Sequence, residues 1–438
     1  MEFGVWGLEF PPRMKKTFRV ISGSVTAPKG FRAAAAAAGI KRSGKPDVAL
    51  IVSDVPAVVA GTFTSNRVKA APLKVSIPRI ARGLARAIIV NSGNANCCTG
   101  AQGIRDAKEM CVLTAAALKS QNSNLKSIFP HDILVCSTGH IGRPMPMDKI
   151  RAAIPVAVAA LDPHGGGVER AIMTTDTFSK TCAVEFRVAG KTCRIGGICK
   201  GAGMIAPKMQ SYSSSFSSSN LHATMLCFIT TDVSLPCATL QRCLNDAVSQ
   251  SFNCITVDGD MSTNDTVLLL ANGASAKIQT ARDRKTFLAA LNHVTLTLAK
   301  MIARDGEGAT KLVTIRVEGA KTDTDAALAA RAIAESPLNK CSFAGGDPNW
   351  GRLMDALGYS GTRVNEAKVE IRYNNVVAVK MGVVGRAPSR GESLIHCLRK
   401  IVAHKEFEIT LNLHLGSGTA TMYTCDFTEQ YVRENLGE

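Results

Sequence analysis

Short apolar runs that end at polar, glycine-containing turns recur along this chain, and they alternate with segments whose apolar residues share one helical face. Residues 87–90 and 133–136 are two such runs, and a turn-forming segment follows each of them. The apolar positions between residues 287 and 302 instead repeat every three or four residues. Short apolar runs are typical of buried strands, and the longer repeat is typical of an amphipathic helix. The pattern predicts a mixed α/β fold with substantial sheet.

Other segments extend this prediction. Helical spacing also occurs in residues 110–118, and Gly306 is expected to close the helix that contains residues 287–302. Strand-like alternation returns in residues 369–373 and 407–413. The serine-rich run 210–222 favours an exposed, flexible loop.

Composition excludes several classes of protein. With 438 residues, 46% hydrophobic and 20% charged, the chain resembles an ordinary α/β enzyme of two or three domains. Its longest apolar stretches fall short of the ~20 residues that a membrane span needs, so we expect no membrane partner. The net charge of +17 is spread along the chain, and aromatic residues make up only 5%. Without a basic block or stacking aromatics, no nucleic-acid partner is predicted.

The 14 cysteines contain no Cys-x-x-Cys pair. A zinc site or a disulfide framework would need paired spacing, so no metal is expected. Most of the cysteines lie in apolar runs, for example Cys136, Cys182, Cys227 and Cys341. This predicts buried, reduced thiols in a reducing compartment. Residues 1–16 lack the features of a secretory signal, so the cytoplasm is expected, with an organellar matrix as the alternative.

A threonine at the mouth of a predicted strand is the first candidate for chemistry. Ala223 and Thr224 precede the strand-like residues 225–230, and the turn Lys200-Gly201-Ala202-Gly203 lies before the serine-rich run. A threonine hydroxyl is a poor nucleophile without a base beside it. Cleavage of the preceding peptide bond would supply the α-amine of Thr224, whose pKa would be roughly 7.7–8.0. A threonine that simply starts a strand is the commoner explanation of such a residue on its own.

The turn Ser137-Thr138-Gly139 follows a predicted strand directly. A glycine lets backbone amides approach a ligand closely, and a threonine hydroxyl adds a donor, so this turn could form an oxyanion hole. An ordinary turn at the end of a strand is the alternative.

Two more polar segments have structural explanations. Residues 258–265 resemble the start of a calcium loop, but the sixth position is Thr263 and the twelfth is Leu269. A calcium loop needs glycine and an acid there, so an acidic turn-rich loop before a strand is predicted instead. Residues 346–352 concentrate turn formers around Trp350, which predicts a tight structural loop.

Together and in this order, these segments resemble the bifunctional glutamate N-acetyltransferase/ornithine acetyltransferase family. The match runs over nearly the whole chain, from Thr26 to Val432. The matching segments are residues 26–31, 91–96 with 99–100, 137–139, 173–177, 200–207, 223–232, 258–266, 305–311, 336–338 and 346–352. Each segment alone is weak, but the whole set in one order is specific.

The resemblance implies a layered α-β-β-α sandwich that is similar to amino-terminal-nucleophile enzymes. It implies self-cleavage between Ala223 and Thr224. The products would be an α chain of residues 1–223, with the serine-rich insertion 210–222, and a β chain of residues 224–438. These fragments would stay associated, with two α and two β chains in the assembly.

The resemblance also implies an activity and its residues. Acetyl would pass from N2-acetyl-L-ornithine to L-glutamate by ping-pong chemistry through an acetyl-threonine at Thr224. Residues that match the oxyanion positions are Thr138 and Gly139. Residues that match substrate-binding positions are Thr174, Lys200, Thr224, Glu307 and Asn435. No cofactor is implied, although some members accept acetyl-coenzyme A as donor.

The chain departs from the family pattern in two places. In the family the alanine-threonine pair follows the segment 204–209 almost at once, whereas residues 210–222 intervene here. The family also continues past the asparagine matched by Asn435 to a substrate-binding threonine, whereas this sequence ends at Glu438. Two alternatives therefore stay open. One is a self-processing aminopeptidase or amidase of the same fold, and the other is an inactive binding protein.

Overall fold

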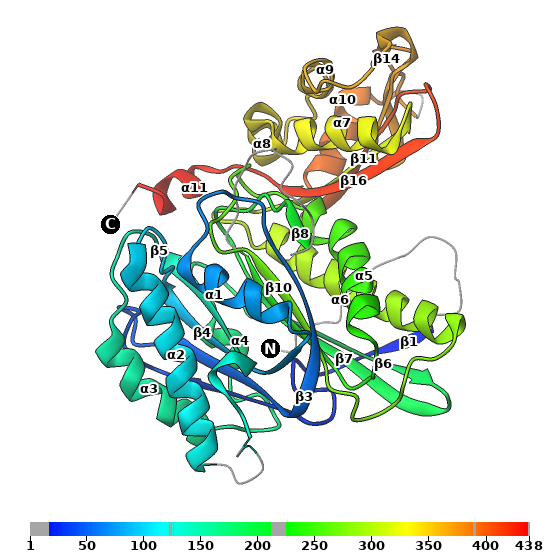
Figure 1. The fold of residues 1–438 in the computed structure, drawn as a ribbon. Helices are drawn as coiled ribbons and strands as arrows, with labels where there is room; N and C mark the ends of the chain where they lie inside the picture. The colour runs from blue at the N-terminus through cyan, green and yellow to red at the C-terminus, as the bar shows by residue number, and fades with distance from the viewer. Residues whose placement is uncertain (1–16, 122–124, 126, 212–224, 389–390, 437–438) are drawn as a thin grey trace.

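The computed structural model describes residues 17–121, 125, 127–211, 225–388 and 391–436, which form two units (Figure 1). The larger unit is built on a ten-stranded sheet and the smaller unit, which begins at Leu312, on a six-stranded sheet. In Figure 1 the smaller unit, coloured yellow to red, lies above the larger one. Helix α11 (Glu429–Glu434) returns from the smaller unit toward the larger one, so the end of the described chain connects the two.

The ten-stranded sheet takes strands from both sides of the predicted cleavage site. Its order is β1-β6-β7-β9-β10-β3-β4-β5, and β2 and β8 pair with β3 outside this path. The strands are β1 (Phe18–Ile21), β2 (Phe31–Ala36), β3 (Val48–Thr64), β4 (Leu84–Asn94), β5 (Ile133–His140), β6 (Lys180–Val188), β7 (Lys191–Lys200), β8 (Met209–Ser211), β9 (Leu226–Thr231) and β10 (Thr266–Ala271). β9 is antiparallel to β7 and parallel to β10. The division into residues 1–223 and 224–438 stays a prediction, and residues 212–224 lie outside the described part of the chain.

Strand β3 joins the two layers into which this sheet folds. Its first part pairs with β2 and β4, and its second part pairs with β10. The register with β4 shifts between Val52 and Ala57, and such a bulge bends a strand. Because β3 has 17 residues, where about 5–6 is usual, one strand can belong to both layers.

Alternate side chains of each strand reach opposite faces of the sheet, as the two-residue period of a strand requires. On β3, Ile51 faces an apolar cluster between the two layers, whereas Val52 faces the outer cluster beneath two helices. The helices of the larger unit are α1 (Ala71–Ile80), α2 (Gly100–Gln121), α3 (Met147–Ala159), α4 (Val168–Ala171), α5 (Cys237–Ser249) and α6 (Ala281–Arg304). α2 and α3 cover the outer face of the β3-β4-β5 layer.

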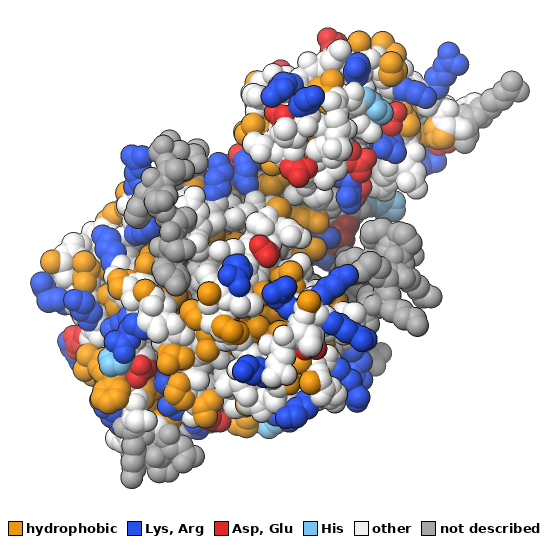
Figure 2. Space-filling view, turned by 45° about the vertical axis from the view of Figure 1, so that its right-hand side comes forward, with side chains coloured by type: hydrophobic (Ala, Val, Ile, Leu, Met, Phe, Trp, Pro, Cys, Tyr) orange, Lys and Arg blue, Asp and Glu red, His pale blue; other side chains and the backbone are white. Residues whose placement is uncertain are grey.

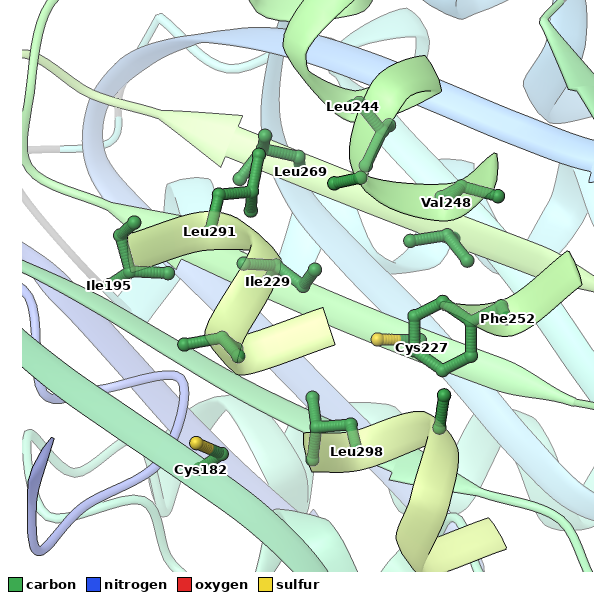
Figure 3. Packing of buried hydrophobic residues seen from close by; sticks show 14 of the residues in the cluster. Cys182, Ile195, Cys227, Ile229, Leu244, Val248, Phe252, Leu269, Leu291 and Leu298 are labelled. Carbon is green, nitrogen blue, oxygen red and sulfur yellow. The ribbon is translucent and has the colours of Figure 1, made fainter. Parts of the chain in front are cut away.

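Helices α5 and α6 cover the other outer face (Figure 3). There Leu244 of α5 and Leu298 of α6 pack over Ile229 of β9. The layers therefore run helices, sheet, sheet, helices, with an apolar cluster at each junction. This confirms the predicted α-β-β-α sandwich.

Helix α6 is the helix that the apolar repeat of residues 287–302 predicts. It begins with a capping box in which Thr280 and Asp283 each accept a hydrogen bond from the other's backbone N–H. Asp305 takes the C-cap position, and Gly306 follows it without a left-handed φ. Gly306 is needed for space instead, because a Cβ there would lie 2.8 Å from Cys425 Sγ.

Among the described helices, α6 alone is long and apolar enough to cross a membrane. However, 50% of its apolar window is buried, and its side chains pack against strands of the larger unit. A core helix of a large unit has these same properties.

The smaller unit has the strand order β14-β13-β12-β15-β11-β16. Its strands are β11 (Leu312–Ala320), β12 (Glu370–Tyr373), β13 (Val376–Lys380), β14 (Val383–Val384), β15 (Glu406–Asn412) and β16 (Gly418–Cys425). Its helices are α7 (Asp323–Glu335), α8 (Pro337–Ala344), α9 (Trp350–Gly358) and α10 (Leu394–Val402). Ile371 and Leu411 are partners in register and belong to one apolar core, which confirms the two strands predicted from alternation.

Some predicted loops are regular structure instead. β4 and β5 continue through the predicted turns to Asn94 and His140, because Ser137 Oγ donates to Asn91 Oδ1 at 2.6 Å and satisfies these polar side chains within the sheet. Trp350 does not lie in a loop but opens α9, which Asn349 caps. The predicted serine-rich loop overlaps β8 at its start, and the rest of it, residues 212–222, lies outside the described residues.

Basic side chains lie in several separate groups on the face that Figure 2 shows, and apolar and acidic side chains lie between them. This distribution agrees with a net charge of +17 that is spread over the chain. On this face it gives no continuous basic stripe of the kind that follows a nucleic-acid backbone.

Candidate active site

Several strand ends meet at one edge of the ten-stranded sheet. Lys200, the last residue of β7, pairs with Leu226 at the start of β9, and Leu226 pairs on its other side with Thr266 of β10. β5 brings Thr138 to the same place, since Lys200 Nζ lies 3.2 Å from Thr138 Oγ1. The segments that the sequence singles out for chemistry are therefore neighbours in space.

The ammonium group of Lys200 holds two threonine hydroxyls. It donates to Thr138 Oγ1 at 3.2 Å and to Thr174 Oγ1 at 2.7 Å. Thr138 is 0% and Lys200 is 2% exposed. Burial lowers the pKa of Lys200, and the carboxylates of Asp176 and Glu307 partly oppose this. A buried cation that already orients two hydroxyls is suited to attract an anion, because charges interact more strongly away from water.

The backbone at Gly139 tolerates no side chain. Its φ is +129°, and a Cβ there would lie 2.3 Å from the carbonyl carbon of Gly93. The amide of Asn264 fixes the neighbouring chain, because Nδ2 donates to the carbonyl oxygens of Ser137 and Ala95 at 2.8 Å each. Backbone held this firmly can present N–H groups to a developing negative charge without rearrangement.

A buried network of ion pairs lies beside Lys200. The carboxylate of Asp176 accepts hydrogen bonds from Lys180 Nζ at 2.6 Å and from the Gly201 N–H at 2.7 Å, and it lies 4.0 Å from Lys200 Nζ. Asp305 is a second partner of Lys180, at 2.5 Å. Burial disfavours the charge of Asp176, but Lys200 and Lys180 outweigh it and hold its pKa at about 2. Burial likewise disfavours the charge of Lys180, yet Asp176 and Asp305 raise its pKa.

Sequence reasoning does not predict this network. Asp176 lies in the matched segment 173–177, and Asp305 is the first residue of the matched segment 305–311. The sequence therefore singles out both positions, although it does not predict their pairing with Lys180. Lys180 lies in neither segment. The available signal is a lysine that directly precedes the apolar run of β6, where a charge needs a buried partner.

Glu307 and Asn435 meet beside the turn of residues 200–205. Asn435 Nδ2 donates to Glu307 Oε2 at 2.9 Å. Glu307 packs directly on Gly203, where a Cβ would lie 2.3 Å from its carboxyl carbon. Gly308 approaches α11 closely, since a Cβ at Gly308 would lie 2.4 Å from the Tyr431 nitrogen. The structure thus brings two predicted substrate-binding residues together, and their roles stay predictions.

Ala223 and Thr224, the predicted cleavage pair, lie outside the described residues. The chain resumes at Met225, which is fully buried. Its N–H donates to Asp265 Oδ1 at 2.5 Å. Met225 directly precedes Leu226, which pairs with Lys200, and Thr224 is the residue before Met225 in the sequence.

The cysteines contain no disulfide, and Cys136, Cys182 and Cys227 are buried as predicted. Cys341 is exposed, so its predicted burial is wrong: it lies on the outward face of α8. Burial raises the pKa of the Cys227 thiol, which keeps it protonated. Within the residues that the structure describes, no group of three or more His, Cys, Asp or Glu side chains could hold a metal ion.

The fold and this site together define a class of protein. An α-β-β-α sandwich with polar groups gathered where a central strand begins is similar to amino-terminal-nucleophile enzymes. Residues 32–437 match the ArgJ family. The chain belongs to this family, which confirms the resemblance seen in its sequence.

Curated relatives match along nearly their whole length. The arginine biosynthesis bifunctional protein ArgJ of Geobacter sulfurreducens is 45% identical over 413 residues, which are 93% of this chain and 98% of that protein. The glutamate N-acetyltransferase of Methanocaldococcus jannaschii is 45% identical over 424 residues, 95% of this chain and 98% of that protein. Among solved structures, the Bacillus halodurans arginine biosynthesis bifunctional protein argJ is 39% identical. That comparison covers 48% of this chain and 98% of the other, with a TM-score of 0.45.

Proposed function

We propose that this chain is an acetyltransferase of arginine biosynthesis that moves the acetyl group of N2-acetyl-L-ornithine to L-glutamate through an acetyl-threonine at Thr224. One observation supports it most. A buried lysine, Lys200, orients the hydroxyls of Thr138 and Thr174 beside the start of β9, and Thr224 directly precedes the first described residue of that segment. The family to which the chain belongs is the second support.

The chemistry divides into two half-reactions. The Thr224 hydroxyl attacks the acetyl carbonyl carbon, its proton passes to the freed α-amine, and ornithine leaves with a proton on its nitrogen. Thr138 and the backbone at Gly139 stabilise the oxyanion of each tetrahedral intermediate. The α-amino group of glutamate then attacks the acetyl-threonine, which restores the hydroxyl. The barrier is split into two lower ones, as in other ping-pong transfers.

The site offers complementary charges to both substrates. The Lys200 ammonium and the Thr174 hydroxyl suit a carboxylate. The Glu307 carboxylate, which Asn435 orients, suits the side-chain ammonium of ornithine. The proposal includes acetyl-coenzyme A as a second donor. The cut between Ala223 and Thr224, an α2β2 assembly and a cytoplasmic location belong to it as well.

Intact mass spectrometry tests the proposal directly. The purified chain is incubated with N2-acetyl-L-ornithine, and we expect two fragments, with one acetyl group added to the fragment that begins at Thr224. Thr224→Ala removes the hydroxyl, so we expect a single uncut chain and no adduct. Thr224→Ser keeps a hydroxyl and serves as the matched control. A full-length wild-type chain without an acetyl adduct would refute the proposal.

The aminopeptidase or amidase alternative passes its acyl group to water instead of to an amine. The same sample answers this if glutamate is added and both products are measured. We expect N-acetylglutamate to form in step with ornithine release, with little free acetate. Acetate in equal amount to ornithine would favour the hydrolase.

A further inference from the structure

Cys97 and Cys98 lie in the loop between β4 and α2, and their sulfur atoms are in contact. Side chains of neighbouring residues point to opposite sides of an extended chain. Here the backbone is not extended, because Cys98 has a left-handed φ of +57°, and the two Sγ atoms lie 3.8 Å apart. Both thiols are free. The distance is a contact without a bond, since a disulfide bond is about 2.0 Å long.

Hydrogen bonds on both sides hold this loop in place. The Cys97 carbonyl oxygen accepts the Gly142 N–H at 2.9 Å. Asn96 Oδ1 accepts the Thr99 hydroxyl at 2.7 Å, and Asn96 Nδ2 donates to the Gly103 carbonyl oxygen at 2.9 Å. The backbone therefore keeps the two thiols close together, which gives each a high effective concentration at the other.

The two thiols differ in exposure. Cys97 is 1% exposed, whereas Cys98 is open to solvent. Burial raises the pKa of the Cys97 thiol, and a hydrogen bond with the Thr263 side chain partly opposes this. A reagent from solvent thus meets Cys98 first, and Cys97 is placed to react second. An exposed thiol beside a resolving thiol is the arrangement of redox-sensitive cysteines.

Buried hydrogen bonds connect Cys97 with the turn that contains Thr138. The Cys97 thiol bonds the Thr263 side chain. Thr263 Oγ1 in turn donates to Asn264 Oδ1 at 2.5 Å. Asn264 Nδ2 donates to the carbonyl oxygen of Ser137 at 2.8 Å. A change at Cys97 is therefore transmitted to the residue directly before Thr138.

We propose that Cys97 and Cys98 are a modification site, a dithiol that low-molecular-weight disulfides oxidise to a disulfide bond, and that this bond disturbs the turn at Thr138. The Cys98 thiolate attacks one sulfur of the reagent, which releases one thiol and leaves a mixed disulfide. The Cys97 sulfur then attacks Cys98 Sγ and displaces the second thiol. Two protein sulfurs are oxidised, and the reagent is reduced to two thiols, which take up the two protons that the protein thiols lose.

A bond between neighbouring cysteines is suited to reversible modification. Adjacent Cα atoms are about 3.8 Å apart, closer than the roughly 4.4–6.8 Å that most disulfides span. A bond across so short a separation is strained and easily reduced. It also draws the Cys97 sulfur toward Cys98 and away from Thr263, which weakens the connection to Asn264.

Dithiodipyridine, a small aromatic disulfide, tests the chemistry. The folded full-length chain is treated with it, free thiols are alkylated in acid, and the peptides released by trypsin are weighed. Residues 87–105 form one such peptide, with Cys97 and Cys98 as its cysteines. We expect this peptide to be two hydrogen atoms lighter and to carry no pyridylthio group.

The exposed Cys341 is the matched control within the same sample. It is the one cysteine of the tryptic peptide 341–352, and the residues beside it in the chain are not cysteines. It should therefore keep a pyridylthio group, because no adjacent thiol displaces it.

Two variants separate the roles of the thiols. Cys97→Ser removes the resolving sulfur, so its peptide should keep one pyridylthio group on Cys98. Cys98→Ser leaves the buried thiol, which should react at least about tenfold more slowly. The wild-type chain decides the matter even if a variant fails to fold. A pyridylthio group that stays on Cys98, or a pair that does not react, overturns the proposal.

Hydrogen exchange tests the effect on the turn. Exchange of the backbone amides of residues 137–140 should become at least about tenfold faster in the oxidised chain. Dithiothreitol should restore the original rate, and Cys98→Ser should show no change after the same treatment. Unchanged exchange in a chain that carries the disulfide would overturn the proposed effect on Thr138.

Acetyl transfer provides a separate readout, and this one rests on the proposed function. Oxidation should lower the rate at least about tenfold in the wild type but not in Cys98→Ser, and dithiothreitol should restore it. A reduced chain that transfers no acetyl group would refute the proposed function. The peptide masses and the exchange rates would still decide whether the dithiol is oxidised and whether the turn responds.

Discussion

Two buried lysines, Lys180 on β6 of the larger unit and Lys340 on α8 of the smaller unit, have different partners. Beside the candidate site, Lys180 is held by two carboxylates, Asp176 and Asp305, and all three side chains are at most 2% exposed. In the smaller unit, Lys340 is also fully buried, yet its hydrogen bonds go to neutral groups. Nζ donates to Thr424 Oγ1 at 2.9 Å and to the Cys425 carbonyl, and it lies 4.5 Å from the centre of the Phe427 ring.

This difference shows in which unit the buried charged side chains depend strongly on one another. Opposite charges in a poorly solvated place depend on one another, so removal of one leaves the other unpaired. Hydrogen bonds to neutral partners contribute less, about 0.5–1.5 kcal/mol each. The edge of the larger sheet therefore holds its groups rigidly but tolerates little change. The smaller unit should accept replacement of its buried lysine more easily.

The largest expected effect comes from Lys180→Met. Without the ammonium, the carboxylates of Asp176 and Asp305 stay buried and lose their shared partner. We expect the free energy of unfolding to fall by about 3–5 kcal/mol. Urea denaturation of the whole protein, followed through the unfolding of the larger unit, measures it. Lys191→Met, at the exposed start of β7, is the control and should change little. A cost below about 1 kcal/mol would contradict strong coupling.

Acid should weaken the same network by a smaller amount. The pKa of Asp176 is about 2 in the folded protein, below the ordinary 3.8, so its pairing stabilises the fold fully above the higher value. This contribution, about 2 kcal/mol, is lost as pH falls through the folded pKa. Asp176→Asn does not titrate. The stability difference between wild type and Asp176→Asn should therefore shrink between pH 5 and pH 2, and a constant difference would disprove the pairing.

Lys340→Met should have the smallest effect. The change removes hydrogen bonds to Thr424 and Cys425 but also removes a buried charge, and these two consequences oppose each other. We expect the unfolding free energy to change by at most about 1.5 kcal/mol, measured as a shift in the thermal midpoint. If Lys340→Met proves as costly as Lys180→Met, the contrast between the two units is wrong.

The sequence predicts elements of the fold where local periodicity is strong. α6 and the strands β12 and β15 follow their apolar repeats closely. β8 is not predicted from the sequence. It overlaps the serine-rich run, and three residues carry too little pattern to distinguish a strand from a loop. β4 and β5 run further than predicted, since polar side chains there find partners across the sheet rather than in water.

The candidate site is predicted only in part. Lys200 contacts Thr138 and Thr174, which the resemblance assigns to the same site. Lys200 and Thr138 are 62 positions apart, and a contact over such a separation leaves no periodic signal in the sequence. Asp305 and Lys180 are 125 positions apart, and Asn264 reaches Ser137 across 127. Such contacts depend on how distant strands are ordered, and no local pattern encodes that order. The supporting groups of a site are therefore harder to find than its principal residues.

The strand order has a consequence for the mature protein if the chain is cut before Thr224. β9 and β10 of the downstream fragment lie between β7 and β3 of the upstream one. Neither piece could then rebuild the sheet alone, and denatured halves would have to find each other by diffusion. Renaturation would become second order in protein concentration, whereas the uncut precursor folds as a single molecule.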